Sequence, residues 1–388
     1  MPFQVVSSPV EGGILVLFSH LLSKASVVGV DIGSSSIKVV CIEPTKLGPR
    51  ISQIAICPTP PGVVKEGVVT STAEVASAIQ FAMRSAGIKA SAVVTAIAGP
   101  GVIVRNVKVP KMSEDALRKS IRFEAGKFIS SAIEESIVEF DIIGDAEEEG
   151  QSNIVLVAAP RAMVETKVAA LEQAGLEPLA VDVEAFALLR ALQSRPDSGI
   201  SADGTVALLD MGASHTEINL VSKGELALTR NIPIAGNNLT TAIRNASGCT
   251  DDEAEEMKFS VNLQDLLEPT EEARESIALR AVQPLVDELL REIRRSINYY
   301  QSQLPEGSDA TVDTLILTGG TARIKGLAEY TKSRLNVQAI VGSPALTGMF
   351  DFSAAPEGMS EDDMPLLAVG LGLALKELPA ASLAAAAA

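Results

Sequence analysis

The N-terminal part of the chain alternates between apolar runs and short polar breaks, which is the pattern of β-strands joined by tight turns. Apolar residues fill most of 27–42, except for a break at 33–36 where one glycine and three serines stand together. Glycine and serine favour tight turns for backbone reasons, so this stretch predicts a β-hairpin. A third strand is expected near 50–60, where isoleucines recur.

Helical spacing follows at 71–87. Val75, Ile79, Ala82 and Met83 fall on one face, Ser71 or Thr72 can cap the start, and Gly87 can end the helix. A β-branched run at 90–99 then predicts another strand. The expected order of this first unit is therefore β-β-β-α-β.

A separate α+β unit is expected at roughly 98–180, inserted before the chain resumes its first pattern. Ser113 is a predicted helix cap, because acidic residues follow it in the first turn. The elements expected in this unit are strands at 102–110, 137–144 and 152–160 and helices at 113–129 and 161–176.

The second half begins with a strand and helix over 179–193, and strands follow over 205–234. The stretch 236–305 is mainly helical, and Pro284 inside it should kink or break a helix. A strand, a glycine turn and a helix are predicted over 314–335.

Two hairpins repeat one motif. "VVGVDIGSSSIKVVCIE" and "TVALLDMGASHTEINLV" each place an aspartate, a glycine and a serine between two strands, with Asp31 and Asp210 lying 179 positions apart. Either turn alone is an ordinary hairpin turn. Two similar hairpins, each opening one half of a chain, indicate duplicated domains.

The chemistry of both turns suits phosphate. Gly33 and Gly212 let the backbone approach a ligand closely, and Lys38 can reach a phosphate as a point charge. Aspartates beside a polyphosphate need a cation, so Asp31 and Asp210 predict Mg²⁺ held partly through water. The hydroxyls expected to donate to phosphate oxygens, together with backbone N–H groups, are those of Ser34, Ser35, Ser36, Ser214 and Thr216.

The composition of the chain argues against several classes of binding site. The chain has 388 residues and a formal charge of −17, which argues against a general nucleic-acid surface or a direct hold on an anionic membrane. With two histidines and no CxxC pair among three cysteines, a zinc site is not expected. Cys41 and Cys57 lie in apolar runs and are predicted core thiols, and nothing implies a disulfide framework, which favours the cytoplasm.

The three polar segments, taken in order, resemble the actin, chaperone and sugar-kinase ATPase superfamily. "DIGSSSIK" resembles its first phosphate loop with Lys38 at the phosphate lysine, "DMGASHT" its second, and "TGGTARI" its adenosine motif. "VDVEAFALLRAL" resembles the connecting helix, which places Glu184 where it orients water or metal. The resemblance implies ATP as ligand, with a nucleoside wall made by Gly236, Asn237, Glu255, Lys258, Gly319, Gly320, Thr321, Arg323 and Ile324.

Ser214 and His215 stand where relatives often carry glycine and threonine, so hydrolysis is expected to be slow at most. His215 is interpreted first as a turn residue. The catalytic positions that the resemblance implies are Asp31, Glu184 and Asp210.

The insert narrows the resemblance to the FtsA-like branch and, within it, to the PilM family of type IV pilus assembly proteins. Phrases such as "VRNVKVPKMSEDALRKSIRFEA" and "IPIAGNNLTTAI" carry it, and it covers roughly 27–378. The implied fold is α/β, with two duplicated actin-like domains around a nucleotide cleft and an inserted α+β subdomain. The implied division is an N-terminal extension 1–26, domain IA from 27–97, 181–205 and 346–378, insert IC 98–180, domain IIA from 206–235 and 309–345, helical subdomain IIB 236–308 and a low-complexity tail 379–388.

The family implies an ATP- and Mg²⁺-binding part of the inner-membrane pilus platform that binds the short cytoplasmic N-terminal peptide of PilN. The protein would then be cytoplasmic and reach the membrane through that partner, because its tail is a poor membrane anchor. Other platform and motor proteins and a homo-oligomer or ring are further expected partners. The alternatives are an FtsA-like division protein and a small-molecule kinase or phosphatase of the same superfamily.

Overall fold

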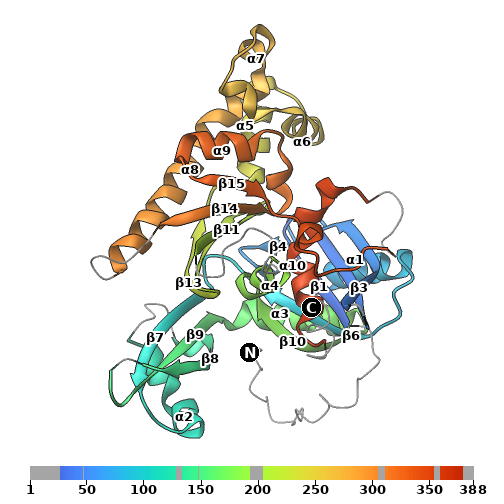
Figure 1. The fold of residues 1–388 in the computed structure, drawn as a ribbon. Helices are drawn as coiled ribbons and strands as arrows, with labels where there is room; N and C mark the ends of the chain where they lie inside the picture. Colours follow the sequence, from blue (N-terminus) through green and yellow to red (C-terminus); the bar gives the residue numbers. More distant parts are fainter. Residues whose placement is uncertain are drawn as a thin grey trace. The chain divides into compact units, whose positions relative to one another are not determined.

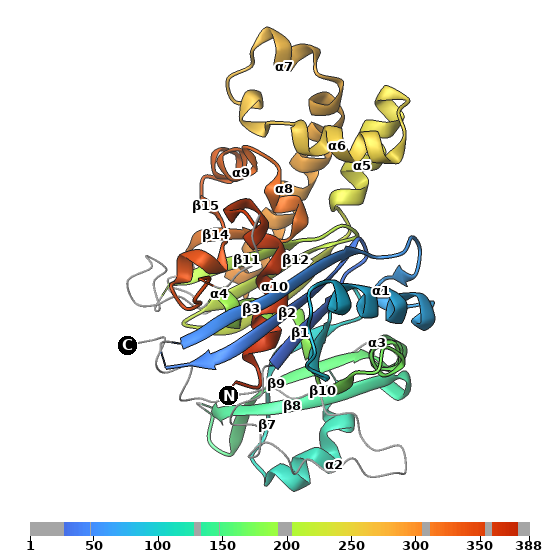
Figure 2. The same cartoon turned by 90° about the vertical axis from the view of Figure 1, so that its right-hand side faces the viewer.

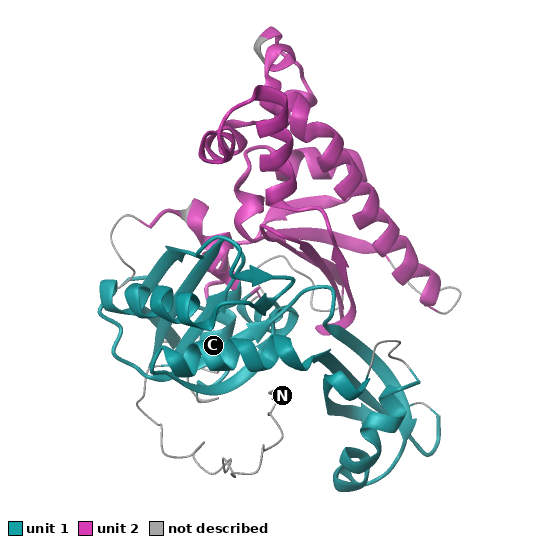
Figure 3. Ribbon diagram, turned by 180° about the vertical axis from the view of Figure 1, so that it is seen from behind, with its two compact units in different colours: residues 1–191, 349–357, 369–388 teal, residues 192–348, 358–368 magenta. Residues whose placement is uncertain are grey.

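The structure is a computed structural model that describes residues 27–46, 48–127, 133–146, 148–192, 204–304, 311–353 and 359–378. The expectations for 1–26, for 128–129 at the end of one predicted helix and for the tail 379–388 lie outside these residues. The chain divides into two compact units (Figure 3). Unit 1 comprises 1–191, 349–357 and 369–388, and unit 2 comprises 192–348 and 358–368.

Unit 1 is built on a five-stranded sheet in the order β10-β6-β1-β2-β3 (Figure 1). β1 pairs antiparallel with β2 and parallel with β6, β6 pairs parallel with β10, and β2 pairs antiparallel with β3. The predicted hairpin and the three strands after it are thus present. Their bounds are β1 Val27–Ile32, β2 Ser36–Thr45, β3 Gly48–Pro58, β6 Ala92–Ile97 and β10 Glu177–Val183.

Helices α1 (Thr72–Ser85) and α3 (Arg161–Gln173) lie side by side and cover one face of this sheet (Figure 2). Their apolar side chains share one core with the strands, and the thiols of Cys41 and Cys57 are buried in it as predicted. α3 falls within the range 98–180 yet packs on α1. Ser71 occupies the cap position of α1, but its side chain makes no capping hydrogen bond.

Helix α4 (Glu184–Leu192) follows β10, and the later helix α10 (Met364–Leu375) belongs to unit 1 from residue 369 onward. α10 lies very close to β1, since a Cβ built on Gly29 would stand 2.1 Å from the Gly370 carbonyl oxygen. It lies equally close to α4, since a Cβ on Gly372 would stand 1.8 Å from the Ala187 oxygen. Glycine is required at these contacts. A short ladder of β4 (Val64–Lys65) and β5 (Val68–Val69) completes this part.

The insert forms its own antiparallel sheet in the order β7-β9-β8, with α2 (Glu114–Ala125) on one face. Leu117 and Ile121 of α2 belong to one buried cluster with Val107, Val109 and Phe140 of the sheet. Figure 1 shows α2 beside this sheet. The Ser113 hydroxyl accepts the Ala116 N–H, so the predicted cap is confirmed. The strands are β7 Ile103–Pro110, β8 Ser136–Asp145 and β9 Gln151–Pro160.

Unit 2 repeats the strand arrangement of unit 1, in the order β13-β12-β11-β14-β15. Its first three strands are antiparallel and β11, β14 and β15 are parallel, so β11 and β12 correspond to β1 and β2. The duplication predicted from the two hairpins is confirmed. The bounds are β11 Thr205–Met211, β12 Thr216–Ser222, β13 Glu225–Ile232, β14 Val312–Thr318 and β15 Gln338–Val341.

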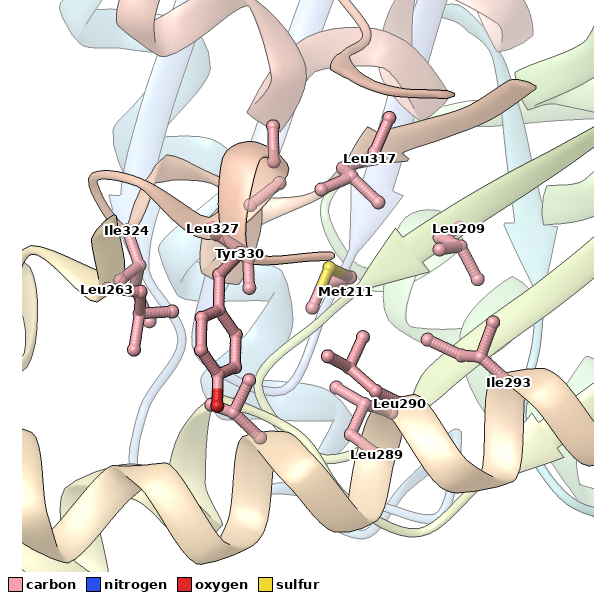
Figure 4. Packing of buried hydrophobic residues seen from close by; sticks show 14 of the residues in the cluster. Leu209, Met211, Leu263, Leu289, Leu290, Ile293, Leu317, Ile324, Leu327 and Tyr330 are labelled. Carbon is pink, nitrogen blue, oxygen red and sulfur yellow. The ribbon is translucent and has the colours of Figure 1, made fainter. Parts of the chain in front are cut away.

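The helices of unit 2 pack on one face of this sheet around Met211, Leu289, Leu317 and Tyr330 (Figure 4). Of the kink or break predicted at Pro284, the break does not occur, because α8 runs through this residue. Proline costs one backbone hydrogen bond there, and ten buried residues along α8 outweigh that loss. The helices are α5 Gly236–Ser247, α6 Asp251–Ser260, α7 Glu271–Glu275, α8 Ile277–Gln303 and α9 Leu327–Leu335.

Candidate functional site

The turn between β1 and β2 is held closed from two sides. The Gly33 N–H donates to the Ser36 carbonyl at 3.2 Å, which closes the turn itself. Thr59, just after β3, donates its hydroxyl to the Gly33 carbonyl at 2.8 Å and its N–H to the Ser35 carbonyl at 2.9 Å. Gly33, Ser34 and Ser35 therefore lie on a turn anchored to the neighbouring strand.

Beneath this turn, Lys38 and Asp31 face each other across the hairpin. They are register partners of β1 and β2, and the Lys38 Nζ lies 2.9 Å from the Asp31 Oδ2. Both side chains are nearly buried, at 11% and 8% exposed, so the ion pair is shielded from water. A Cβ on Gly33 would stand 3.2 Å from the Lys38 Nζ, so glycine keeps the turn close to the ammonium.

A second lysine, which sequence reasoning missed, lies at the carboxyl ends of the parallel strands of unit 1. Lys167 of α3 is 2% exposed and donates to the Ala96 carbonyl at 2.7 Å. Burial lowers the pKa of its ammonium, while the charges of Glu184 and Asp31 act to raise it. The available signal was its spacing, because Lys167 stands four residues after Met163 on the buried face of α3.

The turn between β11 and β12 has the same closure but different charges. The Gly212 N–H donates to the His215 carbonyl at 3.1 Å, so His215 serves the turn as interpreted. Ser214 Oγ lies 3.1 Å from His215 Nδ1. Asp210 faces Glu217 across the ladder, where the first hairpin has its lysine.

The helix after β13 begins on this second turn. The Gly212 carbonyl accepts the Gly236 N–H at 3.1 Å and the Thr321 hydroxyl at 2.8 Å. The Asn237 N–H donates to the Ala213 carbonyl at 2.8 Å. The hydroxyl of Thr216, by contrast, donates to the Ile234 carbonyl at 2.7 Å and is wholly buried.

Glu255 and Lys258 stand beside the start of α5. The Lys258 Nζ lies 2.6 Å from the Glu255 Oε1 and donates to the Thr240 hydroxyl at 3.1 Å. Burial lowers the pKa of Lys258, and the Glu255 carboxylate acts in the opposite direction. A Cβ on Gly236 would stand 2.7 Å from the Thr321 oxygen and 3.4 Å from the Lys258 Nζ. Glycine at 236 therefore lets the start of α5 approach both α6 and the turn at 320–323.

The glycine turn after β14 lies directly against Asp210. Gly319 has a φ of +83°, and a Cβ there would stand 2.4 Å from the Asp210 Oδ1. The Arg323 guanidinium lies 3.2 Å from the Asp363 carboxylate and 5.6 Å from the centre of the Phe259 ring, and Lys258 lies 4.8 Å from the same ring. Phe259 is a residue that sequence reasoning missed.

Each unit thus brings together one set of predicted residues. Two residues of the second set differ from the prediction. The side chain of Ile324 is buried in the core of unit 2, and the Thr216 hydroxyl, expected to donate to phosphate, is buried and donates to the Ile234 carbonyl. The set of unit 1 is Asp31, Gly33, Ser34, Ser35, Lys38 and Glu184, and the set of unit 2 is Asp210, Gly212, Ser214, Thr216, Gly236, Asn237, Glu255, Lys258, Gly319, Gly320, Thr321 and Arg323.

Across the part of the chain that the structure describes, no cluster of three or more His, Cys, Asp or Glu side chains is placed to hold a metal ion. Mg²⁺ commonly takes only one or two protein carboxylates and completes its shell with water and phosphate. Single carboxylates at the ends of β1 and β11 fit that mode of binding. Within the described ranges, no helix is both long enough and apolar enough to cross a membrane.

The sequence model of a family described as "Type IV pilus assembly protein PilM" matches residues 29–378. The chain is also similar to the cell division protein FtsA of Escherichia coli K12, with 28% identity over 225 residues, covering 53% of this chain and 52% of that protein. It is 25% identical to FtsA of Pseudomonas aeruginosa over 85% of this chain and 86% of that protein. The chain spans about half the length of the first curated relatives that it matches.

A solved structure, a "PilM-PilN type IV pilus biogenesis complex", matches 92% of this chain and 99% of its own, with a TM-score of 0.79 and 28% identity. The ethanolamine utilization protein EutJ of Carboxydothermus hydrogenoformans matches with a TM-score of 0.54 and 21% identity, covering 90% of this chain and 89% of that one. This second likeness concerns the fold alone.

Proposed function

The chain belongs to the type IV pilus assembly protein PilM family, and we propose that it is an ATP-binding component of the pilus assembly platform at the inner membrane. One observation carries the proposal, the similarity to the PilM–PilN complex over 92% of this chain. The predicted actin-like α/β fold with duplicated domains is confirmed, as is the resemblance to the PilM family. The subdomain division stated above is part of the proposal.

We propose that ATP and Mg²⁺ engage the predicted residues of both units. In unit 1, the closed turn at 33–36 presents hydroxyls and backbone above the Lys38 ammonium. In unit 2, Lys258, Glu255 and Arg323 surround the start of α5 and the Gly319 turn with charge and hydrogen-bonding groups. Mg²⁺, when bound, would neutralise phosphate charge, with Asp31 and Asp210 holding it through water and Glu184 orienting water. Hydrolysis is slow in this proposal, because a strong general base is not part of either set.

Isothermal titration calorimetry with ATP and Mg²⁺ tests the assignment through Asp31→Ala. This change removes one of the two carboxylates proposed to hold Mg²⁺, so ATP affinity measured with Mg²⁺ should fall by at least about tenfold. Lys332→Ala on the exposed face of α9 is the control and should bind as the wild type does. If Asp31→Ala binds ATP as tightly as the control, the site assignment is wrong.

We propose that the partner at the membrane is PilN and that its N-terminal peptide binds beside the insert. The support is the similarity of this chain to a solved complex of PilM with PilN. Much of the apolar and basic surface that the sequence shows in the insert is already engaged within it. Val107 and Val109 fill its core, Arg118 pairs with Glu114 and Glu139, and Arg122 donates to the Ile133 carbonyl.

Hydrogen exchange measured by mass spectrometry on the intact protein, with and without a synthetic PilN N-terminal peptide, tests this placement. Protection is expected in β7, β8, β9 and α2 and in the strands of unit 1. Protection confined to unit 2 would contradict the placement, and unchanged exchange at saturating peptide would contradict PilN as the partner. Localisation at the inner membrane through that partner is part of the same proposal.

A further inference from the structure

Lys167 stands out among the buried charges of unit 1, because it lies where the proposed ATP and Mg²⁺ site needs carboxylates rather than cations. Its Nζ donates to the carbonyl of Ala96, near the end of β6. β6 lies between β1 and β10 in the sheet. Asp31 follows the Val30–Thr95 pair on one side, and Glu184 follows the Val183–Ile97 pair on the other. Asp31 and Glu184 thus end the strands on either side of β6, and the charges of both carboxylates act on the Lys167 ammonium.

The position of this lysine is fixed by the packing of α3. Its neighbour Thr166 accepts the Val69 N–H at 3.1 Å, which ties α3 to β5. Met163, one turn earlier, packs so closely on Gly67 that a Cβ there would stand 2.9 Å from the Met163 Cε. Only 2% of Lys167 is exposed, so its ammonium is held inside unit 1.

The charged groups that unit 1 contributes to the proposed site balance one another without a metal. Two carboxylates, Asp31 and Glu184, stand against two ammonium groups, Lys38 and Lys167, and Lys38 contacts Asp31 directly. A divalent cation entering this neutral set meets two fixed positive charges in a poorly screened environment. The polyphosphate of a nucleotide adds negative charge to the site, and this charge attracts the same cation.

We propose that Lys167 is a positioning residue that acts as an internal counter-cation to Asp31 and Glu184, so that the site takes up a divalent metal only together with a nucleotide. This inference rests on the proposed ATP and Mg²⁺ site, but it makes a statement about the nucleotide-free protein that can be tested by itself. Without Lys167, the carboxylates gain a net negative charge and attract a divalent cation directly.

The test measures Mn²⁺ binding to the nucleotide-free full-length protein by electron paramagnetic resonance. Lys167→Met keeps the length of the side chain and removes its charge, and it should bind Mn²⁺ at least about tenfold more tightly than the wild type. Lys167→Arg keeps the charge and should behave as the wild type does. Lys119→Met, at an exposed position of α2, is the matched lysine control and should also change nothing.

Adding Glu184→Gln to Lys167→Met should remove the gained Mn²⁺ affinity, since one of the two released carboxylates is then gone. Equal Mn²⁺ affinity in Lys167→Met and the wild type would overturn the inference. So would a gain that survives Glu184→Gln. Because these measurements contain no nucleotide, they decide the role of Lys167 even if calorimetry shows that the wild type does not bind ATP.

Loss of folding in Lys167→Met is also informative. If the single variant is unfolded and the double variant with Glu184→Gln is folded by circular dichroism, uncompensated carboxylate charge is the cause, as the inference requires. If both are unfolded, the fold needs the Lys167 ammonium for its hydrogen bond to Ala96 and not as a counter-charge to Glu184, and the inference fails.

Discussion

Replacing Asp182 with asparagine should destabilise unit 1 by about 3–5 kcal/mol, because it leaves a buried lysine without its counter-ion. Asp182 stands near the end of β10, two residues before Glu184. One carboxylate oxygen lies 2.9 Å from the Arg190 Nη2, and the other lies 3.2 Å from the Lys376 Nζ. The side chains of Asp182 and Lys376 are both 0% exposed.

The size of the expected stability loss depends on which of the two cations, Arg190 or Lys376, can reach water. Arg190 is 22% exposed and also donates to the Gly372 carbonyl, so it can be solvated when Asp182 loses its charge. Lys376 cannot, and burial already lowers the pKa of its ammonium. Lys376→Met in the Asp182→Asn background removes the stranded charge and should recover about 2 kcal/mol or more.

Equilibrium urea unfolding measures both changes, with hydrogen exchange of peptides from β6 and β10 identifying the transition of unit 1. Asp145→Asn is the control. Asp145 is 69% exposed and its partner Lys111 is 56% exposed, and such exposed ion pairs contribute about 0–1 kcal/mol to the free energy of unfolding. The reasoning is refuted if Asp182→Asn costs no more than the control. A double variant no more stable than Asp182→Asn alone would also refute it.

Three further predictions concern packing and titration. Gly372→Ala should cost about 1–3 kcal/mol in urea unfolding, because its Cβ would meet the backbone of α4, while Gly144→Ala, with nothing within 4 Å, should be near neutral. Pro284→Ala should raise the stability of unit 2 by about 1–3 kcal/mol, because it restores a backbone donor inside α8, and an unchanged midpoint would contradict this. Burial and the hydrogen bond to Asp287 raise the pKa of Tyr330 from 10.0 to about 12, so the folded state holds its proton longer and stability should fall as pH rises from 10 towards 12. Tyr330→Phe should remove the step near pH 12 from the tyrosinate absorbance titration, which is readable because the chain has three tyrosines and no tryptophan.

The sequence alone was sufficient for the features that depend on neighbours along the chain. The two hairpins follow from apolar alternation and from turn residues, and their repetition predicted the duplicated sheets that the structure shows. The Ser113 cap depends on residues three positions apart. The contact of Asp31 with Lys38 was not predicted, although the hairpin register makes the two residues partners.

The positions of the most deeply buried charged groups in unit 1 were decided by tertiary structure. Lys167 meets the carbonyl of Ala96, 71 positions away, and Arg190 meets Gly372, 182 positions away. Helical spacing puts Lys167 on the same face of α3 as Met163, but nothing in the local sequence tells which groups close over that lysine. Pro284 is a second example. The cost of a proline inside a helix could be predicted from the sequence, but the burial of α8 that outweighs this cost could not. Local patterns record propensities of a few tenths to a few kcal/mol, while the burial of a charge depends on which distant strands and helices close over it.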